Sequence, residues 1–159
     1  MNYSNPAAYE LFMGRWSARL TPSFLRFAEV QDGQHVLGVG CGTGILSRAL
    51  VSCGAMIRVT GIDPVLAYVS FALEEMPDSR AQFEVGAAET LPFSDGTFDA
   101  ALALLVLQDF ADPAQAVSEM RRVAQFATGN STLIVRFGSG ADIPTLPSCS
   151  GKQSNAHVT

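Results

Sequence analysis

The sequence is poor in basic residues and in long apolar runs, and each shortage excludes a class of protein. Ten lysines and arginines stand against 15 aspartates and glutamates, which leaves a net charge of −5. No basic run is longer than Arg121-Arg122. Nucleic-acid-binding domains usually carry a basic patch, so we predict no nucleic-acid partner. The longest wholly apolar run, residues 100–107, is far too short to cross a bilayer, so we predict no membrane span.

Cysteine and histidine are also scarce. The three cysteines, Cys41, Cys53 and Cys149, are odd in number and show no CxxC spacing, which favours a reducing compartment over a disulfide scaffold. His35 and His157 lie far apart in the sequence, so we predict no metal site. The first residues show neither a basic nor an apolar leader region. We therefore expect a cytoplasmic protein.

Apolar residues and glycine are abundant instead. The chain is 48% apolar, with a mean hydropathy of +0.22, so it can bury a core. Its 159 residues predict one domain. We place this domain over residues 1–137, with a helical segment over 1–31. Residues 138–159 are dominated by glycine, serine and proline without periodicity, and we predict a disordered tail there.

Strand patterns alternate with helix patterns along this domain. Thr21-Pro22, Asp63-Pro64 and Asp112-Pro113 each place a capping side chain before a proline, which predicts a helix start. We expect helices over residues 21–30, 45–53, 63–76 and 112–126, and strands over 35–39, 56–62, 82–86, 98–105 and 131–137. The alternation predicts an α/β fold with a doubly wound, mostly parallel sheet of about five strands.

The most informative stretch is residues 36–44, VLGVGCGTG. An apolar strand breaks into alternating glycines and then passes into a helix pattern. Such a turn lets the backbone approach a ligand closely and points unpaired helix N–H groups at that ligand. The alternative is a turn that merely joins strand to helix. A ligand explains four alternating glycines better, because glycines weaken a turn that has no such task.

The spacing of these glycines restricts the ligand. A Walker phosphate loop requires a Gly-Lys pair five positions after its first glycine, and no glycine of this chain has such a pair at that offset. The dinucleotide fingerprint requires a third glycine five positions after the first, and the chain has Thr43, Ile45 or Ser47 there. A nicotinamide-dependent dehydrogenase is therefore a less favoured alternative. Asp63, at the end of the next predicted strand, can accept hydrogen bonds from both ribose hydroxyls of a nucleoside. It can also cap a helix, and both roles can hold together.

Four motifs in order carry a family resemblance. They are residues 36–44 (VLGVGCGTG), 59–64 (VTGIDP), 88–99 (AETLPFSDGTFD) and 116–123 (AVSEMRRV). On these motifs the chain, over about residues 7–125, resembles class I S-adenosylmethionine-dependent methyltransferases. The resemblance is to the small-molecule group similar to the ubiquinone/menaquinone-biosynthesis enzymes. It implies S-adenosyl-L-methionine as the cofactor, a small-molecule methyl acceptor as the partner, and methyl transfer as the activity.

The resemblance also implies which residues hold the cofactor. The glycine turn would line its methionine part and Asp63 would hold its ribose. Ala88 and Glu89 would lie along the adenine, and residues 104–106 would face the reacting centre. The implied cofactor-binding residues are Gly38, Gly40, Cys41, Gly42, Gly44, Asp63, Pro64, Ala88, Glu89 and Leu104.

No catalytic residue is assigned. Cys41 has no histidine nearby in the sequence, which argues against a nucleophile. Asp109 can face an acceptor, whereas Asp112 is most simply a helix cap. Tyr9 and Trp16 match an N-terminal segment that closes the site in such enzymes, and the alternative is that both aromatic rings pack on the core.

Two positions depart from the family. It usually has Asp at the position of Gly38, where the carboxylate anchors the cofactor's ammonium group, and often Asp at Ala87, which takes the adenine amino group. These departures favour an alternative function, a catalytically impaired cofactor-binding or scaffold remnant. The family sheet has seven strands and we count five. Residues 132–137 are thus expected to form an exposed edge strand through which the chain can self-associate.

Overall fold

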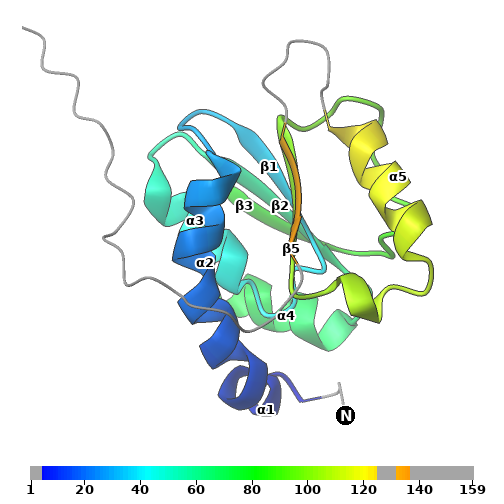
Figure 1. The fold of residues 1–159 in the computed structure, drawn as a ribbon. Helices are drawn as coiled ribbons and strands as arrows, with labels where there is room; N and C mark the ends of the chain where they lie inside the picture. The colour runs from blue at the N-terminus through cyan, green and yellow to red at the C-terminus, as the bar shows by residue number, and fades with distance from the viewer. Residues whose placement is uncertain (1–4, 125–131, 137–159) are drawn as a thin grey trace, which may run out of the picture.

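Five parallel strands form the centre of the protein (Figure 1). The structure, a computed structural model, describes residues 5–124 and the backbone of residues 132–136. The sheet has the order β3-β2-β1-β4-β5, and every neighbouring pair is parallel. The strands are β1 (His35–Val39), β2 (Arg58–Asp63), β3 (Ala81–Val85), β4 (Ala100–Leu104) and β5 (Thr132–Arg136). The predicted α/β class and parallel sheet are confirmed.

Helices cover both faces of this sheet, as a doubly wound fold requires (Figure 1). On one face lie α2, α3 and α4, and on the other lies α5. The helical elements are α1 (Pro6–Tyr9), a π-helical turn η1 (Glu10–Gly14), α2 (Arg15–Ala28), α3 (Ile45–Cys53), α4 (Leu66–Glu75), a 3-10 turn η2 (Leu107–Asp109) and α5 (Pro113–Val123).

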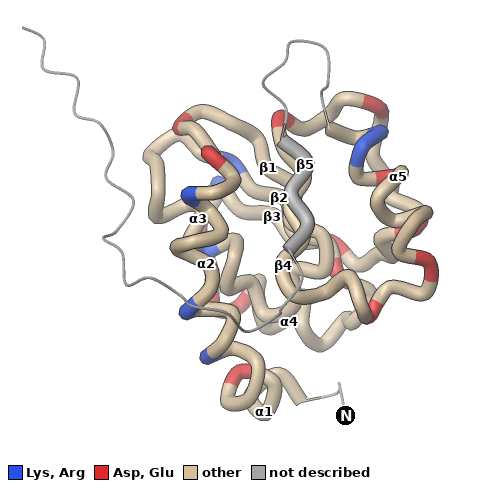
Figure 2. The backbone as a smooth tube through the Cα atoms, in the orientation of Figure 1, with Lys and Arg blue, Asp and Glu red and all other residues tan. Residues whose placement is uncertain are grey.

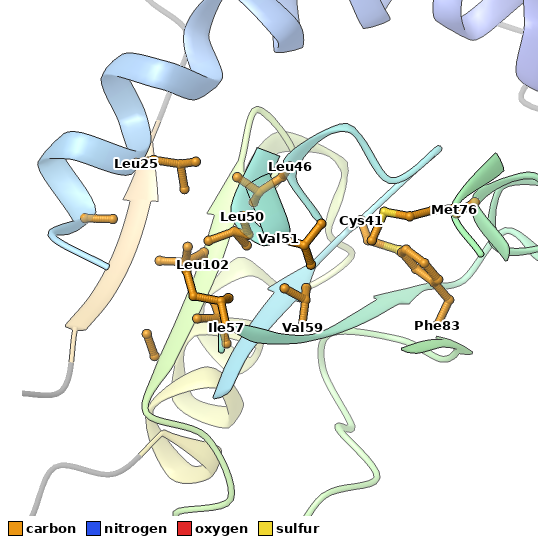
Figure 3. Close-up of a cluster of buried hydrophobic side chains, with 14 of the residues drawn as sticks. Leu25, Cys41, Leu46, Leu50, Val51, Ile57, Val59, Met76, Phe83 and Leu102 are labelled. Atoms are coloured by element: carbon orange, nitrogen blue, oxygen red, sulfur yellow. The ribbon is translucent and has the colours of Figure 1, made fainter. Parts of the chain in front are cut away.

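Alternation along the strands divides the core into two clusters. Val36 packs with α2, α3 and α4, whereas its neighbour Leu37 packs with α5, because successive strand side chains point to opposite faces. Figure 3 shows the first cluster, in which Cys41, Met76 and Phe83 lie together at one end. The second cluster contains Ala116, Met120 and Val123 of α5. Both faces of the central strand β4 are therefore buried, which explains its continuous apolar run over residues 100–104.

The predicted helix start at Thr21 is wrong. The chain is helical from Pro6 to Ala28, and Pro22 lies inside α2. Proline removes the backbone donor that would bond to the Ala18 carbonyl. The Thr21 hydroxyl donates to a different carbonyl, that of Ser17, at 2.7 Å. Thr21 is buried along with Phe24, Leu25 and Ala28. Packing of this side against the core outweighs the local proline signal.

The predicted cap at Asp63 is also wrong. α4 begins at Leu66 with Val65 at the cap position. Asp63 instead ends β2, and its carboxylate accepts a hydrogen bond from the Val65 N–H. Asp112, by contrast, caps α5 as predicted, because its side chain accepts from the Gln115 N–H at 3.0 Å. Other boundaries of the described elements differ from prediction by a few residues.

The strand order creates a crevice. β1 lies between β2 and β4. From β1 the chain runs outward through β2 to β3, and it then crosses back to β4 on the other side of β1. Ligands of open α/β sheets bind where the order reverses, outside the carboxyl ends of the strands. The glycine turn, Asp63 and residues 104–106 all follow carboxyl ends that meet there.

Several predictions concern residues outside the described ranges. The tail over 138–159 and the domain limit at 137 lie there. β5 is the edge of the sheet among the described residues, paired with β4 alone, and self-association through it stays a prediction. No helix among the described residues is both long and apolar enough to cross a membrane.

Candidate cofactor site

A cavity of about 450 Å³ opens at the carboxyl ends of the strands. This size suits a small-molecule ligand. Its lining comes from α1 and from the ends of four strands. The lining residues are Tyr9 of α1, Gly40 and Gly42 after β1, residues 63–65 and Tyr68 at and after the end of β2, residues 86–89 after β3, and residues 104–106 and 109–111 at and after the end of β4. We call it the switch-point cavity. Four strand ends contribute, so the cavity exists only when the sheet is assembled.

The glycine turn forms the floor of this cavity with left-handed backbone. Gly40 and Gly42 have φ angles of 66° and 52°, a region that only glycine adopts readily. A Cβ at Gly40 would lie 2.4 Å from Val106 Cγ2, too close for two carbon atoms, so a larger residue would collide with Val106. A Cβ at Gly42 would face the Tyr9 ring at 3.6 Å. Glycine is therefore required at Gly40 for both backbone conformation and space.

Asp63 connects the end of β2 to the glycine turn. Its Oδ2 accepts a hydrogen bond from the Gly42 N–H and its Oδ1 accepts one from the Val65 N–H, both at 2.9 Å. The residue is only 6% exposed. Burial raises the pKa of Asp63 above its ordinary value, although the two N–H donors oppose this shift. Each carboxylate oxygen offers two acceptor sites, so both oxygens keep capacity for a ligand.

Two tyrosines close one side of the cavity. Tyr9 of α1 and Tyr68 of α4 have ring centroids 4.8 Å apart. Burial raises the pKa of Tyr9 to about 12, and nearby carboxylates, including Asp63, act in the same direction. Its hydroxyl therefore stays protonated and remains a hydrogen-bond donor at neutral pH. The Thr43 hydroxyl donates to the Glu10 carboxylate, which ties the N-terminal helix to the glycine turn.

The loop after β3 forms the opposite wall. Ala88 is buried, and Glu89 lines the cavity beside it. Glu89 Oε1 accepts hydrogen bonds from the Ala111 and Asp112 N–H groups at 2.8 and 3.2 Å. Glu89 thereby joins this loop to the loop before α5, and two separate segments form one surface.

The wall after β4 is apolar and has unusual backbone. Leu104, Leu105 and Val106 line the cavity. Leu105 has a φ of 59°, which costs a side-chain-bearing residue about 1–3 kcal/mol. Such outliers cluster at ligand sites, and here the bend turns the chain from β4 across the cavity.

The structure brings most of the predicted site residues together. Gly40, Gly42, Asp63, Pro64, Ala88, Glu89 and Leu104 all line the switch-point cavity. The remaining three predicted positions do not line it. Gly38 lies within β1, and Cys41 is buried in the first core cluster. Gly44 is the residue before α3, and a Cβ added there would contact Ala72 and Phe83. Burial raises the pKa of the Cys41 thiol well above its ordinary range, which suits a packing role.

Sequence reasoning missed some lining residues and misplaced one. Tyr68 and Phe110 were not anticipated, although Tyr68 follows Asp63 by five positions and so falls in the first turns of α4. Both readings of Trp16 are wrong, because its side chain is 55% exposed and lines neither the cavity nor the core. Tyr9 does line the cavity, and Asp109 lies at its rim.

A buried polar atom lies behind the glycine turn. Ser47 Oγ, in the first turn of α3, has no hydrogen-bond partner among the described residues. A Cβ added at Gly38 would lie 3.9 Å from this oxygen and 3.9 Å from the Thr60 carbonyl, which is ordinary contact. The structure therefore has room for a Cβ at Gly38. No group of three or more metal-ligating side chains occurs within residues 5–124.

Comparison with known proteins agrees with this geometry. Residues 37–126, more than half of the chain, match the family described as the methyltransferase domain. The chain belongs to this family. The match, together with the parallel sheet, makes it a member of the class I S-adenosylmethionine-dependent methyltransferases, as the motifs predicted.

Individual relatives extend the comparison. The ubiquinone/menaquinone biosynthesis C-methyltransferase of Geobacter sp. is 30% identical over 148 residues, covering 87% of this chain and 60% of the relative. A SAM-dependent methyltransferase from Aquifex aeolicus superposes with a TM-score of 0.66 at 20% identity, over 76% of this chain and 68% of that one. The cyclase SpnF superposes with a TM-score of 0.64 at 31% identity, over 70% of this chain and 42% of SpnF. The chain spans 28–60% of the length of the first curated relatives it matches.

Proposed function

We propose that this protein transfers the methyl group of S-adenosyl-L-methionine to a small-molecule acceptor, with the cofactor in the switch-point cavity. The family match supports the cofactor, and the volume and position of the cavity support its location. The curated relatives include C-, N- and O-methyltransferases of small molecules, which supports the class of acceptor.

The hydrogen bond between Asp63 and Gly42 carries this proposal. It joins the sugar-binding carboxylate to the turn that would receive the rest of the cofactor. The bond fixes the carboxylate at the cavity floor before any ligand arrives, so a ribose diol meets a preorganised acceptor. The residues present therefore fit the cofactor.

The protein's own residues would hold the cofactor and align the acceptor, without forming a covalent bond to either. When bound, S-adenosyl-L-methionine supplies a sulfonium-activated methyl group to an attacking nucleophile. Asp63 would hold the ribose, Ala88 and Glu89 would flank the adenine, and Gly40 would leave space for the methionine part. The apolar residues 104–106 would exclude water from the reacting side and align the acceptor. A general base is needed only for an acceptor that must lose a proton.

Binding and transfer test this function separately. We expect isothermal titration calorimetry to show one site for S-adenosylmethionine and one for S-adenosylhomocysteine, each competing with the other. Radiolabelled methyl transfer to a panel of phenols, amines and quinols then tests catalysis. The absence of binding at millimolar ligand would contradict the whole proposal, whereas binding without transfer would support the alternative below.

The alternative function, a cofactor-binding protein with impaired catalysis, rests on Gly38 and Ala87. Neither position supplies the carboxylate that the family usually has. A lost hydrogen bond to a charged group removes about 1.5–3 kcal/mol, or about ten- to a hundredfold in affinity. SpnF, a relative of this fold, is named as a cyclase, so the fold is not restricted to methyl transfer.

The variant Gly38→Asp distinguishes the two functions. A Cβ fits at Gly38, and Ser47 Oγ, which has no hydrogen-bond partner among the described residues, lies 3.9 Å from that position and can donate to a new carboxylate. Under the alternative we expect weak binding by the natural chain and about tenfold tighter binding by Gly38→Asp and by Ala87→Asp. Gly38→Ala, which adds bulk without charge, is the matched control. Unchanged affinity in both aspartate variants would reject the alternative.

A further inference from the structure

The outer side of the N-terminal helix carries exposed apolar side chains. Leu11, Phe12 and Trp16 are 76%, 58% and 55% exposed. With Arg15 and Arg19 they line a groove of about 570 Å³. These five positions recur at helical spacing, so they share one side of the helix. We call them the outer helix face.

The helix that presents this face is firmly held. Its inner side buries Gly14, Phe24, Leu25 and Ala28, and α2 packs against α3. The outer helix face therefore does not belong to a loosely attached segment. Large apolar side chains exposed together on a fixed surface indicate an interaction site.

Charge separates this face from the rest of the molecule. Arg15, Arg19 and Arg26 are exposed along α2. Figure 2 shows blue positions along α2, whereas red positions are frequent around α5. None of the three forms an ion pair within the described part of the chain. Glu10, the one acidic residue between positions 6 and 28, turns inward to Thr43. A basic row thus borders the apolar groove in a chain with a net charge of −5.

We propose that the outer helix face binds the surface of an anionic lipid bilayer. A helix with leucine and aromatic residues beside arginines lies in the plane of the interface, with its apolar side chains at the headgroup–acyl boundary. The arginines would contact anionic headgroups through their guanidinium ends. A protein with an acidic, apolar surface is the other class of occupant. The groove is open, and the arginines form no ion pairs among the described residues. We favour the lipid surface because a bilayer can fit such a surface without having a fixed complementary shape.

The position of this face relates it to the cavity. Tyr9, at the end of α1 and two residues before Leu11, lines the switch-point cavity. Bound to a bilayer, the helix would hold this cavity close to the lipid–water interface. The binding itself does not depend on the proposed methyl transfer, so each can fail without the other.

Trp16 provides a direct signal, because it is the only tryptophan of the chain. The full chain is mixed with vesicles of equal parts phosphatidylglycerol and phosphatidylcholine. We expect its emission to shift to shorter wavelength and the protein to sediment with the vesicles. Salt should weaken binding, since exposed charges are screened, and pure phosphatidylcholine vesicles should bind about tenfold less.

Paired variants separate the apolar and basic contributions. Leu11→Ser with Phe12→Ser should weaken binding to the mixed vesicles about tenfold or more. Arg15→Gln with Arg19→Gln should weaken it similarly and reduce the salt dependence, because Arg26 alone of the row remains. Met56→Ser, at a side chain 68% exposed, and Arg58→Gln, at the exposed start of β2, are matched controls outside the outer helix face. They should bind as the natural chain does.

Three results would overturn the proposal. One is no sedimentation with anionic vesicles at millimolar lipid. Another is an equal loss of binding in the Met56 and Arg58 controls. The third is a stable dimer or a complex with a soluble protein that the same variants abolish while vesicle binding is absent, because the face would then serve another partner. Circular dichroism of each variant verifies that it is folded.

Discussion

At the scale of single residues, Asp63 combines a structural role with a proposed ligand role. Its two oxygens hold the Gly42 and Val65 N–H groups, which fixes the glycine turn relative to the end of β2. The same carboxylate faces the cavity. Sequence spacing identified this residue, but its partners were visible only in the structure.

We predict that Asp63→Asn weakens S-adenosylhomocysteine binding about tenfold or more, because the amide loses charge and one acceptor. Isothermal titration calorimetry measures the affinity. Glu84→Gln, an exposed acidic residue on β3, is the matched control and should bind normally. Equal affinities for Asp63→Asn and the natural chain would remove Asp63 from the site.

The raised pKa of Asp63 predicts a pH dependence. A ribose diol donates to the ionised carboxylate, so affinity should fall as pH decreases through the pKa of Asp63, beginning above its ordinary value of 3.8. Burial makes the native state bind this proton more tightly than the unfolded chain, so the shift itself favours folding at acid pH and opposes it at higher pH. Titrations across mildly acid pH test this, and Asp63→Asn should show a flatter profile. A steeper profile in the variant would contradict the assignment.

Gly40 should be the most demanding glycine of the turn. We predict that Gly40→Ala lowers the free energy of unfolding by about 2 kcal/mol or more, from left-handed backbone and from contact with Val106 at 2.4 Å. Gly33→Ala is the matched control, since its φ is 90° and nothing lies near its Cβ position. Urea unfolding compares the two. Adding Val106→Ala to Gly40→Ala should restore part of the lost free energy of unfolding. Equal free energies of unfolding for Gly40→Ala and Gly33→Ala would exclude the contact with Val106.

At the scale of elements, α5 holds the loop that follows β3. Arg122 donates to the Leu91 and Phe93 carbonyls at 3.0 and 2.7 Å and pairs with Asp95 at 2.9 Å. Glu119 holds Arg122 at 2.8 Å and accepts from the Leu91 N–H. Glu119 and Asp95 raise the pKa of Arg122 further above its already high value. The loop that carries Ala88 and Glu89 therefore depends on one helix for its position.

We predict that Arg122→Lys loosens this loop. Lysine keeps the charge but lacks the planar group that reaches several acceptors together. Amides of residues 91–96 should exchange hydrogen faster, and the melting temperature should fall. Arg58→Lys, an exposed arginine on β2, is the control and should exchange normally. Unchanged exchange in Arg122→Lys would mean that the loop is held by its apolar contacts alone.

At the scale of the whole molecule, the cavity is a product of topology. Segments from Tyr9 to Ala111 meet there because β1 lies between β2 and β4. A ligand that touches all of them should stabilise the complete fold. The stabilisation should therefore extend to all elements that line the cavity and not to one of them alone.

We therefore predict that S-adenosylhomocysteine raises the melting temperature. Ligand at a hundredfold excess over its dissociation constant adds about 2.7 kcal/mol when it binds only the folded state. Differential scanning fluorimetry at increasing ligand measures the shift. Adenosine alone should shift it less at equal concentration, and Asp63→Asn should show little shift. A melting temperature independent of ligand would contradict binding in this cavity.

The N-terminal helix shows where prediction from the sequence was limited. Thr21-Pro22 is a strong local signal for a helix start, yet the helix begins at Pro6 and runs through both residues. The reason is tertiary, because Phe24 and Leu25 pack in the core and align the preceding turns with them. Trp16 was likewise expected over the site or in the core, and it lies outside both.

The sequence by itself determined the α/β class, the glycine turn and the carboxylate that follows β2, because periodicity and spacing are local properties that survive without knowledge of the fold. Tertiary structure alone decided that Tyr9 meets Tyr68 and that Arg122 holds the loop after β3. Each of these contacts joins residues distant in the chain, and only the packing of the helices on the sheet brings them within reach.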